Sequence, residues 1–188
     1  MRRKSYDVLF ETKMGMDWLA QNPTLWRSLF YFVISVGAYV GVCTNVIFSQ
    51  QEMAVRFAIL IAILLVYIIG LVVFGCFLHG LIDACGGGSG NVKGLLCILG
   101  YTGLPFLVLT PVALLAVKGG GFAPLLLPIS TLVGLIWSLY LVIRAVEAVY
   151  IIEFGRSAAV VLFGILLLLL LIFLPVYILV RVVALSLF

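Results

Sequence analysis

Apolar residues in this chain come in five long runs that are separated by short polar stretches. The runs cover residues 28–48, 57–78, 95–117, 125–143 and 158–180. A helix needs about 20 apolar residues to cross a hydrocarbon layer ~30 Å thick. Backbone groups in lipid must pair internally, so runs of this length are helices, because barrel strands would alternate over ~10 residues. The pattern predicts an all-α integral membrane protein, a bundle of five transmembrane helices.

Polar residues at the ends of two runs continue their helices and set the domain boundaries. With them, the expected spans are about 28–48, 57–84, 95–117, 125–152 and 158–180. The chain then divides into a cytoplasmic N-terminal segment (1–27), a five-span membrane domain (28–182) and a short external tail (183–188). Residues 5–21 mix apolar side chains with charges, which suggests a short amphipathic helix on the inner leaflet.

Composition and charge support this assignment and fix an expected orientation. The chain is 65% hydrophobic and 10% charged, whereas a soluble domain carries about 25% charged residues. With the N-terminus inside, eight of the 11 basic residues lie on the inner side, as the positive-inside rule requires. We therefore expect a multi-pass protein of the bacterial cytoplasmic membrane, with its N-terminus cytoplasmic and its C-terminus external. The net charge of +4 suits anionic inner-leaflet lipid and needs no nucleic acid.

A glycine-rich stretch, GGGSGNVKGLLCILGYTGLP (86–105), joins the second and third spans. Gly86 can end the preceding helix in the left-handed conformation, which glycine adopts without strain. The glycines Gly86, Gly87, Gly88 and Gly90 are expected to form a tight cytoplasmic turn between antiparallel helices. The alternative is a mobile loop that meets a partner or a phosphate, although the Lys-Ser/Thr of a nucleotide-binding P-loop is missing.

Two prolines fall inside the third span. Pro105 and Pro111 each remove a backbone hydrogen bond, so this helix should be kinked or broken. Carbonyls freed at membrane depth must face protein or water, which predicts a central position for the third span. Gly100, Tyr101 and Gly103 beside the break suit close packing, with a hydroxyl supplying a hydrogen bond.

Ionisable residues gather at the expected cytoplasmic boundary, and the middle of the membrane carries no charge. The predicted polar cluster consists of His79, Asp83, Lys93, Arg144 and Glu147. Arg144 and Glu147 are three residues apart and can pair within one helical turn. Asp83 near a helix C-terminus lies in an unfavourable dipole field, which suggests a cationic partner such as Arg144. A proton pump or ion-coupled carrier would place an acid or a histidine near the midplane.

The sequence carries no motif for enzymatic chemistry. It has one histidine and lacks H-E-x-x-H, G-x-S-x-G and a mid-membrane carboxylate pair. Cys76, His79 and Asp83 share a helical face, but one histidine makes a weak metal site. The four cysteines are interpreted as reduced, apolar packing residues. We therefore expect no catalytic residue, no metal and no cofactor.

The glycine-rich loop followed by GYTGLPFLVL, together with LVGLIWSLYLVIRAVEAVY (132–150), resembles the Yip-domain family of Ypt/Rab-interacting membrane proteins. That family has a glycine-rich loop, a Tyr-x-x-x-Pro in its third span and a fourth span with a Trp and polar residues at its cytoplasmic end. The resemblance covers roughly residues 25–182 and implies five spans with the N-terminus inside. Eukaryotic members are associated with Rab GTPases and vesicle traffic through a long N-terminal region. The ~27 residues before the first span resemble the compact prokaryotic branch, which implies an accessory role in ABC-type export or envelope-stress complexes.

The expected function is that of a non-enzymatic membrane adaptor or accessory subunit. Its expected partners are membrane lipids and other integral membrane proteins, a transporter or a second copy of itself, met through small-residue helix faces. Gly70, Gly75 and Gly80 are candidates for such a face. Two alternatives stay open: a channel or carrier for a small or lipophilic solute, gated by the broken third helix, and a lipid-organising protein.

Overall fold

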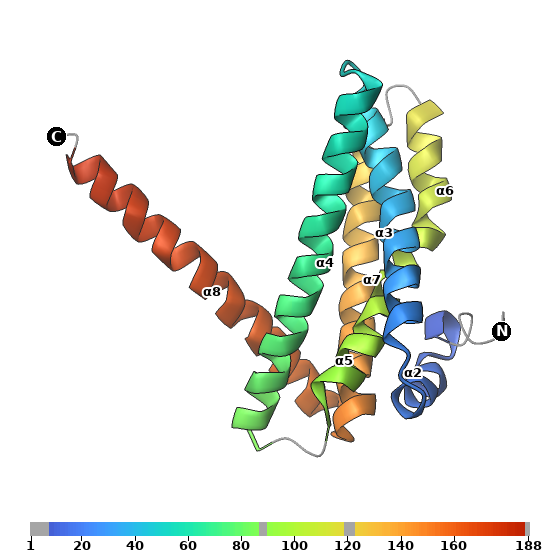
Figure 1. Cartoon of the computed structure of the whole chain (residues 1–188), viewed down its shortest axis with the longest axis vertical. Helices are drawn as coiled ribbons and strands as arrows, with labels where there is room; N and C mark the ends of the chain where they lie inside the picture. The colour runs from blue at the N-terminus through green and yellow to red at the C-terminus, as the bar shows by residue number, and fades with distance from the viewer. Residues whose placement is uncertain (1–7, 87–89, 119–122, 187–188) are drawn as a thin grey trace.

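The computed structural model describes residues 8–86, 90–118 and 123–186, and these residues are helical apart from short connections (Figure 1). The elements in chain order are α2 (Thr12–Gln21), α3 (Leu25–Ile47), α4 (Met53–Ala84), α5 (Val92–Leu99), the 3-10 turn η1 (Gly100–Gly103), α6 (Leu104–Lys118), α7 (Ala123–Tyr150) and α8 (Phe154–Ser186). Within this described part, five helical segments are long and apolar enough to cross a membrane, which confirms the five-span, all-helical prediction.

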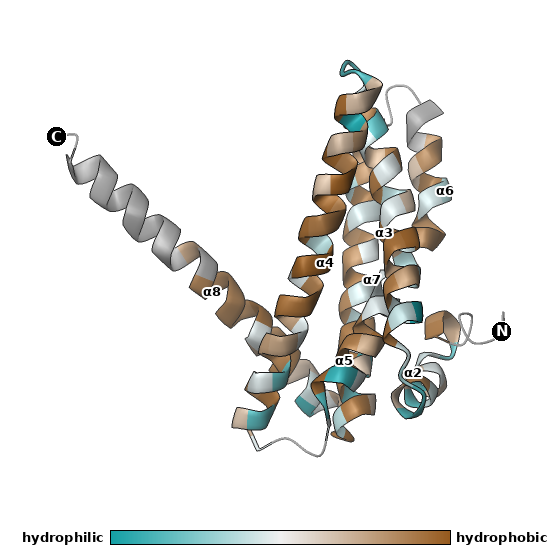
Figure 2. Ribbon diagram, in the orientation of Figure 1, coloured by the Kyte–Doolittle hydropathy of each residue, from teal (hydrophilic) through white to brown (hydrophobic). Residues whose placement is uncertain are grey.

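The helices run up and down between two ends of the bundle. We call the end that holds α2, the C-terminal end of α4 and the turn at 151–153 the proximal end, and the end with the turn at 48–52 the distal end (Figure 1). The apolar middle of the helices and the more polar residues toward both ends are visible in Figure 2. This distribution is the one that a lipid bilayer imposes on a bundle.

The third span lies at the centre of the bundle and changes helix type on its way through it. It consists of α5, η1 and α6, which contact α3, α4 and α7. Of its apolar window, 56% is buried, against 28% or less for each of the other four spans. The predicted central position is therefore confirmed.

Two of the three buried clusters lie in the proximal half. The first joins α2 to η1 and α7 through Met16, Leu19 and Leu141. The second joins α4, α5, α7 and α8, with Leu78 and Val161 at its centre. Both clusters use side chains that are almost completely enclosed. The proximal half is thus held by segments from nearly the whole length of the chain.

Helix α2 packs on the bundle and not only on lipid. Its apolar side, with Met16 and Leu19, is covered by the bundle, and the helix contacts α5 and α7. Phe10, just before the helix, lies edge-on to Trp137 of α7. The short N-terminal helix expected from the sequence is therefore present over residues 12–21, where it forms part of the core.

In the distal half, α4 packs on α3 at two glycines of α3. Leu64 and Leu60 of α4 lie over Gly37 and Gly41 of α3, at 3.6 and 3.9 Å from where a Cβ would stand. Arg56 at the start of α4 also donates a hydrogen bond to the Asn45 side chain of α3 (3.0 Å). Glycines four residues apart allow this close helix approach in lipid.

Helix α8 separates from the bundle after its first turns. Its base packs on α4, where the backbone at Gly164 lies close to Leu78 and Leu81, and the rest of the helix diverges from α4 (Figure 1). The helix continues through Ser186, beyond the expected end at 180, so residues 183–186 are helical. A helical residue forms its hydrogen bonds within its own segment, so the backbone can stay helical without a neighbour.

Candidate functional site

The break in the third span is built around a very close approach of α3. A Cβ on Gly100 would stand 1.9 Å from the hydroxyl of Ser28 and 2.7 Å from its carbonyl oxygen. A Cβ on Gly103 would stand 3.0 Å from the ring of Phe32. No side chain fits at Gly100, so the two glycines allow α3 to cross the break at backbone distance.

Hydroxyl groups from three helices bond to the carbonyls around this break. Thr102 donates to the carbonyl of Leu99 (2.6 Å), and Ser138 of α7 donates to the carbonyl of Thr102 (2.8 Å). Ser28 of α3 donates to the carbonyl of Leu96 (3.4 Å). All three carbonyls therefore face protein, as a lipid environment requires.

The two prolines of the third span occupy different surroundings. Pro105 follows η1 directly, at the second residue of α6, whereas Pro111 lies inside α6 without ending it. Tyr101 is buried, with its ring 5.3 Å from that of Tyr31. The helix changes type on the N-terminal side of Pro105, where the proline lacks the N–H that would continue an α-helix. That the prolines themselves cause the break stays a prediction.

A histidine–tyrosine contact ties α4 to the end of α7. The Nδ1 atom of His79 lies 2.5 Å from the hydroxyl of Tyr150, and its Nε2 atom lies 3.5 Å from Asp83. Tyr150 is 2% exposed, and a Cβ on Gly90 would stand 2.5 Å from its ring. The ring of Tyr150 thus fills the space between α4 and the residue that follows the glycine-rich turn.

The glycine-rich turn begins as predicted. Gly86 has φ +71°, directly after the end of α4, which confirms the left-handed ending. Asn91 caps α5 by accepting a hydrogen bond from the backbone N–H of Gly94 (2.6 Å). Gly87 and Gly88 lie outside the described residues.

Arg144 forms a second polar group on α7, separate from the histidine. It donates to Glu147 (2.7 Å) and to the hydroxyl of Tyr140 (3.0 Å). Its guanidinium carbon also lies 4.5 Å from the ring centre of Phe154, the first residue of α8. Arg144 therefore links the end of α7 to the start of α8, and cations stack favourably on aromatic rings.

The predicted cluster is therefore divided into two groups and one separate residue. The expected pairing of Asp83 with Arg144 was wrong: Asp83 lies beside His79, and Arg144 is occupied by Glu147. The reason is local, because partners three or four residues away on the same helix are reached before a partner on another helix. Lys93 is exposed and has no ion pair among the residues that the structure describes.

The glycines expected on a partner-facing surface also differ from one another. Gly75 is buried against Leu96 and Leu99 of α5, which a Cβ would meet at 2.6 and 3.0 Å. Gly70 and Gly80 have nothing within 4 Å of a Cβ. Gly75 thus serves packing within the chain, whereas the other two leave open space beside α4.

Two residues important to the proximal end were not identified from the sequence. Tyr150, which contacts His79 and Gly90, lies 71 residues from His79 in the chain, and no periodicity links them. The capping role of Asn91 did have a signal, because an Asn two residues before an apolar run is a common helix start.

A cavity of about 390 Å³ lies at the proximal end, between α2, the start of α5 and the end of α7. Its lining includes Asp17, Gln21, Asn91, Ala148, Val149 and Ile151. Ile151 has φ +55°, a conformation that β-branched residues rarely adopt. This cavity mixes polar and apolar walls, and residues from three distant parts of the sequence form it.

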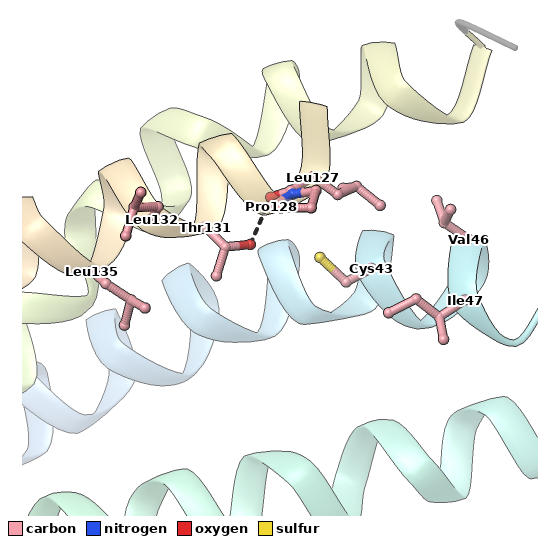
Figure 3. Close-up of a pocket in the computed structure, with 8 residues that line it drawn as sticks. All are labelled: Cys43, Val46, Ile47, Leu127, Pro128, Thr131, Leu132 and Leu135. Carbon is pink, nitrogen blue, oxygen red and sulfur yellow. Dashed lines mark hydrogen bonds between the residues drawn. The ribbon is translucent and has the colours of Figure 1, made fainter. Parts of the chain in front are cut away.

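The distal half holds a wider groove that is almost entirely apolar (Figure 3). It measures about 650 Å³. Its lining residues are Cys43, Val46 and Ile47 of α3 and Leu127, Pro128, Thr131, Leu132 and Leu135 of α7. The hydroxyl of Thr131 donates to the carbonyl of Leu127 (2.8 Å), so the polar group in its wall is already bonded.

A second groove continues toward the middle of the bundle. It measures about 390 Å³ and shares Leu135 with the distal groove. Val66 and Gly70 of α4 line it together with Thr102 and Ser138, whose hydroxyls are both used in hydrogen bonds. Such walls suit apolar side chains or acyl chains, since they present few free polar groups.

Comparison with known proteins gave one match. A model of the Yip1 domain matches residues 6–176 of the chain. No curated protein and no solved structure matches the chain significantly.

Proposed function

Because this chain belongs to the Yip1 domain family, we propose that it is a non-enzymatic membrane adaptor or accessory subunit that acts by binding another integral membrane protein. Its membership and its five apolar helices make it a multi-pass integral membrane protein. The finer statement, that a protein partner completes the bundle, is supported by the uneven way in which the chain covers its own helices.

The observation that carries the proposal is the exposure of α4. None of the most apolar 18-residue window of this helix is buried by the rest of the chain. Its buried residues, Gly75, Leu78 and Ile82, all belong to its last ten positions. Lipid can cover such a surface, but lipid does not explain why open glycines and a groove lie along it.

The space between α4 and α8 is the proposed binding surface. It is bordered on α4 by Val66 and by the open glycine Gly70, and by the diverging part of α8 (Figure 1). Small residues let helix backbones approach closely, and this packing drives association in lipid where no hydrophobic force is available. A transmembrane helix of a transporter subunit or of a second copy would pack on this face of α4, along the groove that Val66 and Gly70 line.

We propose further that the proximal end is cytoplasmic. Lys13, Arg27, Lys93, Arg144 and Arg156 belong to segments at or near the proximal end, whereas Arg56 starts α4 at the distal end. Basic residues accumulate on the cytoplasmic side of membrane proteins. In a bacterium, the partner would then be a membrane complex such as an ABC-type exporter. The chain would contact the transmembrane helices of this complex within the plane of the membrane.

Photo-crosslinking in native membranes tests the proposal. A benzoylphenylalanine at Val66 should give a discrete protein adduct. Val66 is 69% exposed and lines the second groove, the one of about 390 Å³ beside Thr102 and Ser138. The matched control is Leu65, the adjacent residue, which is 54% exposed and points about 100° away around the helix. The control should give lipid adducts. The proposal fails if neither position yields a protein adduct, and an adduct of twice the chain mass identifies a second copy as the partner.

A second candidate function is the handling of a lipophilic solute, which the two connected apolar grooves favour. Reconstitution in liposomes distinguishes the two functions. Solute flux that depends on this protein alone would support the carrier, because an adaptor has no such activity without its partner.

A further inference from the structure

The mixed cavity at the proximal end is not explained by the surface between α4 and α8. It lies at the N-terminal helix side of the bundle and is formed by α2, α5 and α7. We propose that this cavity binds the arginine side chain of a protein partner at the cytoplasmic face. This inference rests on the proposed function, since it assumes a protein partner, but it concerns a separate surface.

The polar part of the cavity is a set of hydrogen-bond acceptors. Asp17 is half-buried and has neither an ion pair nor a hydrogen bond within the described part of the chain. The side chain of Gln21 adds an amide oxygen, and the amide oxygen of Asn91, which already accepts from the N–H of Gly94, keeps a second lone pair. A guanidinium group carries five N–H donors in a planar arrangement and binds carboxylates in a fork. This set of acceptors therefore suits arginine.

The end of α7 adds negative potential to the same cavity. Ala148 and Val149 line it, and they belong to the last turn of a helix that ends at Tyr150. The last four carbonyls of a helix have no partner within it and carry the negative end of its dipole. The N-terminal end of α5 carries positive potential, and this potential is weakened because the N–H of Gly94 already donates to the side chain of Asn91.

The apolar walls fit the rest of an arginine side chain. Ala20, Ala148 and Val149 offer a surface for its aliphatic stem, which prefers apolar contact while the charged group reaches acceptors. Ile151 at the rim is 85% exposed and is held at φ +55°. Exposed apolar groups beside a pocket are common in protein interfaces, and strained residues gather at binding sites.

A phospholipid amine is the competing occupant, and the lining argues against it. Such an amine is joined to a phosphate, which needs a basic residue beside the acidic one. Among the residues that the structure describes, no lysine or arginine lines the cavity, and Lys93 on α5 is exposed outside the lining. A protein side chain brings a cation without a phosphate.

Binding of a short peptide to the purified full-length protein tests the assignment. A fluorescent Ac-Leu-Arg-Leu amide should bind in nanodiscs of phosphatidylcholine, and the same peptide with citrulline, which is neutral and isosteric, should bind about tenfold more weakly or not at all. Asp17→Asn should give a comparable loss. Glu11→Gln, which removes an exposed carboxylate before the same helix, should leave binding unchanged.

Two further measurements keep the outcome interpretable. Asp17→Asn should unfold at the wild-type temperature, because Asp17 has no partner to lose, and Ala148→Leu should abolish binding by filling the cavity. Equal binding of the citrulline peptide, or full binding by Asp17→Asn, would overturn the proposal. Loss of peptide binding in phosphatidylethanolamine nanodiscs would also overturn it, since a lipid amine would then be the occupant. None of these results depends on crosslinking at Val66.

Discussion

The proximal and distal halves of this molecule are made of similar apolar residues, but different contacts hold them together. In the proximal half, side chains from α2, α4, α5, α7 and α8 enclose one another in two buried clusters. In the distal half, α8 has left the bundle and a groove of about 650 Å³ lies between α3 and α7. Lipid can replace protein contacts over more of the distal half than of the proximal half, although one buried cluster around Tyr39 and Ser130 remains in the distal half.

The comparison suggests a division of tasks. The proximal half specifies the fold, since a close crossing, a capped helix and several hydroxyl–carbonyl bonds must form together. The distal half leaves helix faces available, and TM helices associate through such packing surfaces. Equivalent substitutions at tightly packed and at open positions should therefore have unequal effects, and three matched pairs test this, in order of the largest single effect in each pair.

The largest difference is expected between two glycines. Gly100→Ala should lower the free energy of unfolding by ~3 kcal/mol or more, because the new methyl would overlap the backbone of Ser28, and overpacking costs 1–3 kcal/mol or occasionally more. Gly70→Ala, which meets nothing within 4 Å, should instead stabilise α4 by up to about 1 kcal/mol. Thermal unfolding in detergent, followed by fluorescence size exclusion, measures both. Equal effects would show that the close approach of α3 at Gly100 does not constrain the fold more than an open position on α4 does.

A smaller difference is expected between two tyrosines. Tyr150→Phe leaves Nδ1 of His79 without its partner and should destabilise the protein by about 1–2 kcal/mol. Tyr39→Phe removes the contacts to the hydroxyls of Ser130 and Thr131, but both hydroxyls lie within hydrogen-bond distance of the carbonyl of Leu127 and can donate to it in the variant. The distal variant should therefore lose only about 0.5 kcal/mol. A greater loss for Tyr39→Phe in chemical denaturation would contradict the comparison.

The smallest single effects, which are opposite in sign, are expected at two turns. Ile151→Gly should stabilise the protein by about 0.5 kcal/mol, because glycine adopts a positive φ without strain. The greater conformational entropy of glycine in the unfolded chain offsets part of this stabilisation. Phe48→Gly at the distal turn, where φ is −108°, should destabilise by up to about 1 kcal/mol. The melting temperature should rise for Ile151→Gly and fall for Phe48→Gly. A lower melting temperature for Ile151→Gly would show that the turn is not strained.

Local features of the structure could be predicted from the sequence. The five spans follow from run length, the ending at Gly86 follows from glycine's free choice of φ, and the pairing of Arg144 with Glu147 follows from their spacing. The central place of the third span follows from its prolines, since freed carbonyls need protein around them. Each of these depends on residues that are near one another in the chain.

Contacts between distant segments could not be predicted in the same way. The contact of His79 with Tyr150 spans 71 residues, and the cavity beside Asp17 exists only because α2 docks on α5 and α7. The divergence of α8 from the bundle could not be predicted from the sequence either. The long apolar stretch of this helix has no polar face, so it indicates no preferred neighbour. Side-chain periodicity identifies a buried face only where another face is polar.

The bond from Ser138 to the carbonyl of Thr102 has a consequence for how helices align along the membrane normal. Leucine and valine side chains contact one another about equally well if a helix slides by one residue, so apolar packing defines axial register weakly. A slip of α7 by a single position would bring Trp137 or Leu139 opposite the carbonyl and leave its oxygen unpaired in hydrocarbon, which costs several kcal/mol. This hydroxyl, together with the close contact of Phe106 at Gly134, thus sets the height of α7 against the third span and, through it, the depth at which the proximal side chains meet water.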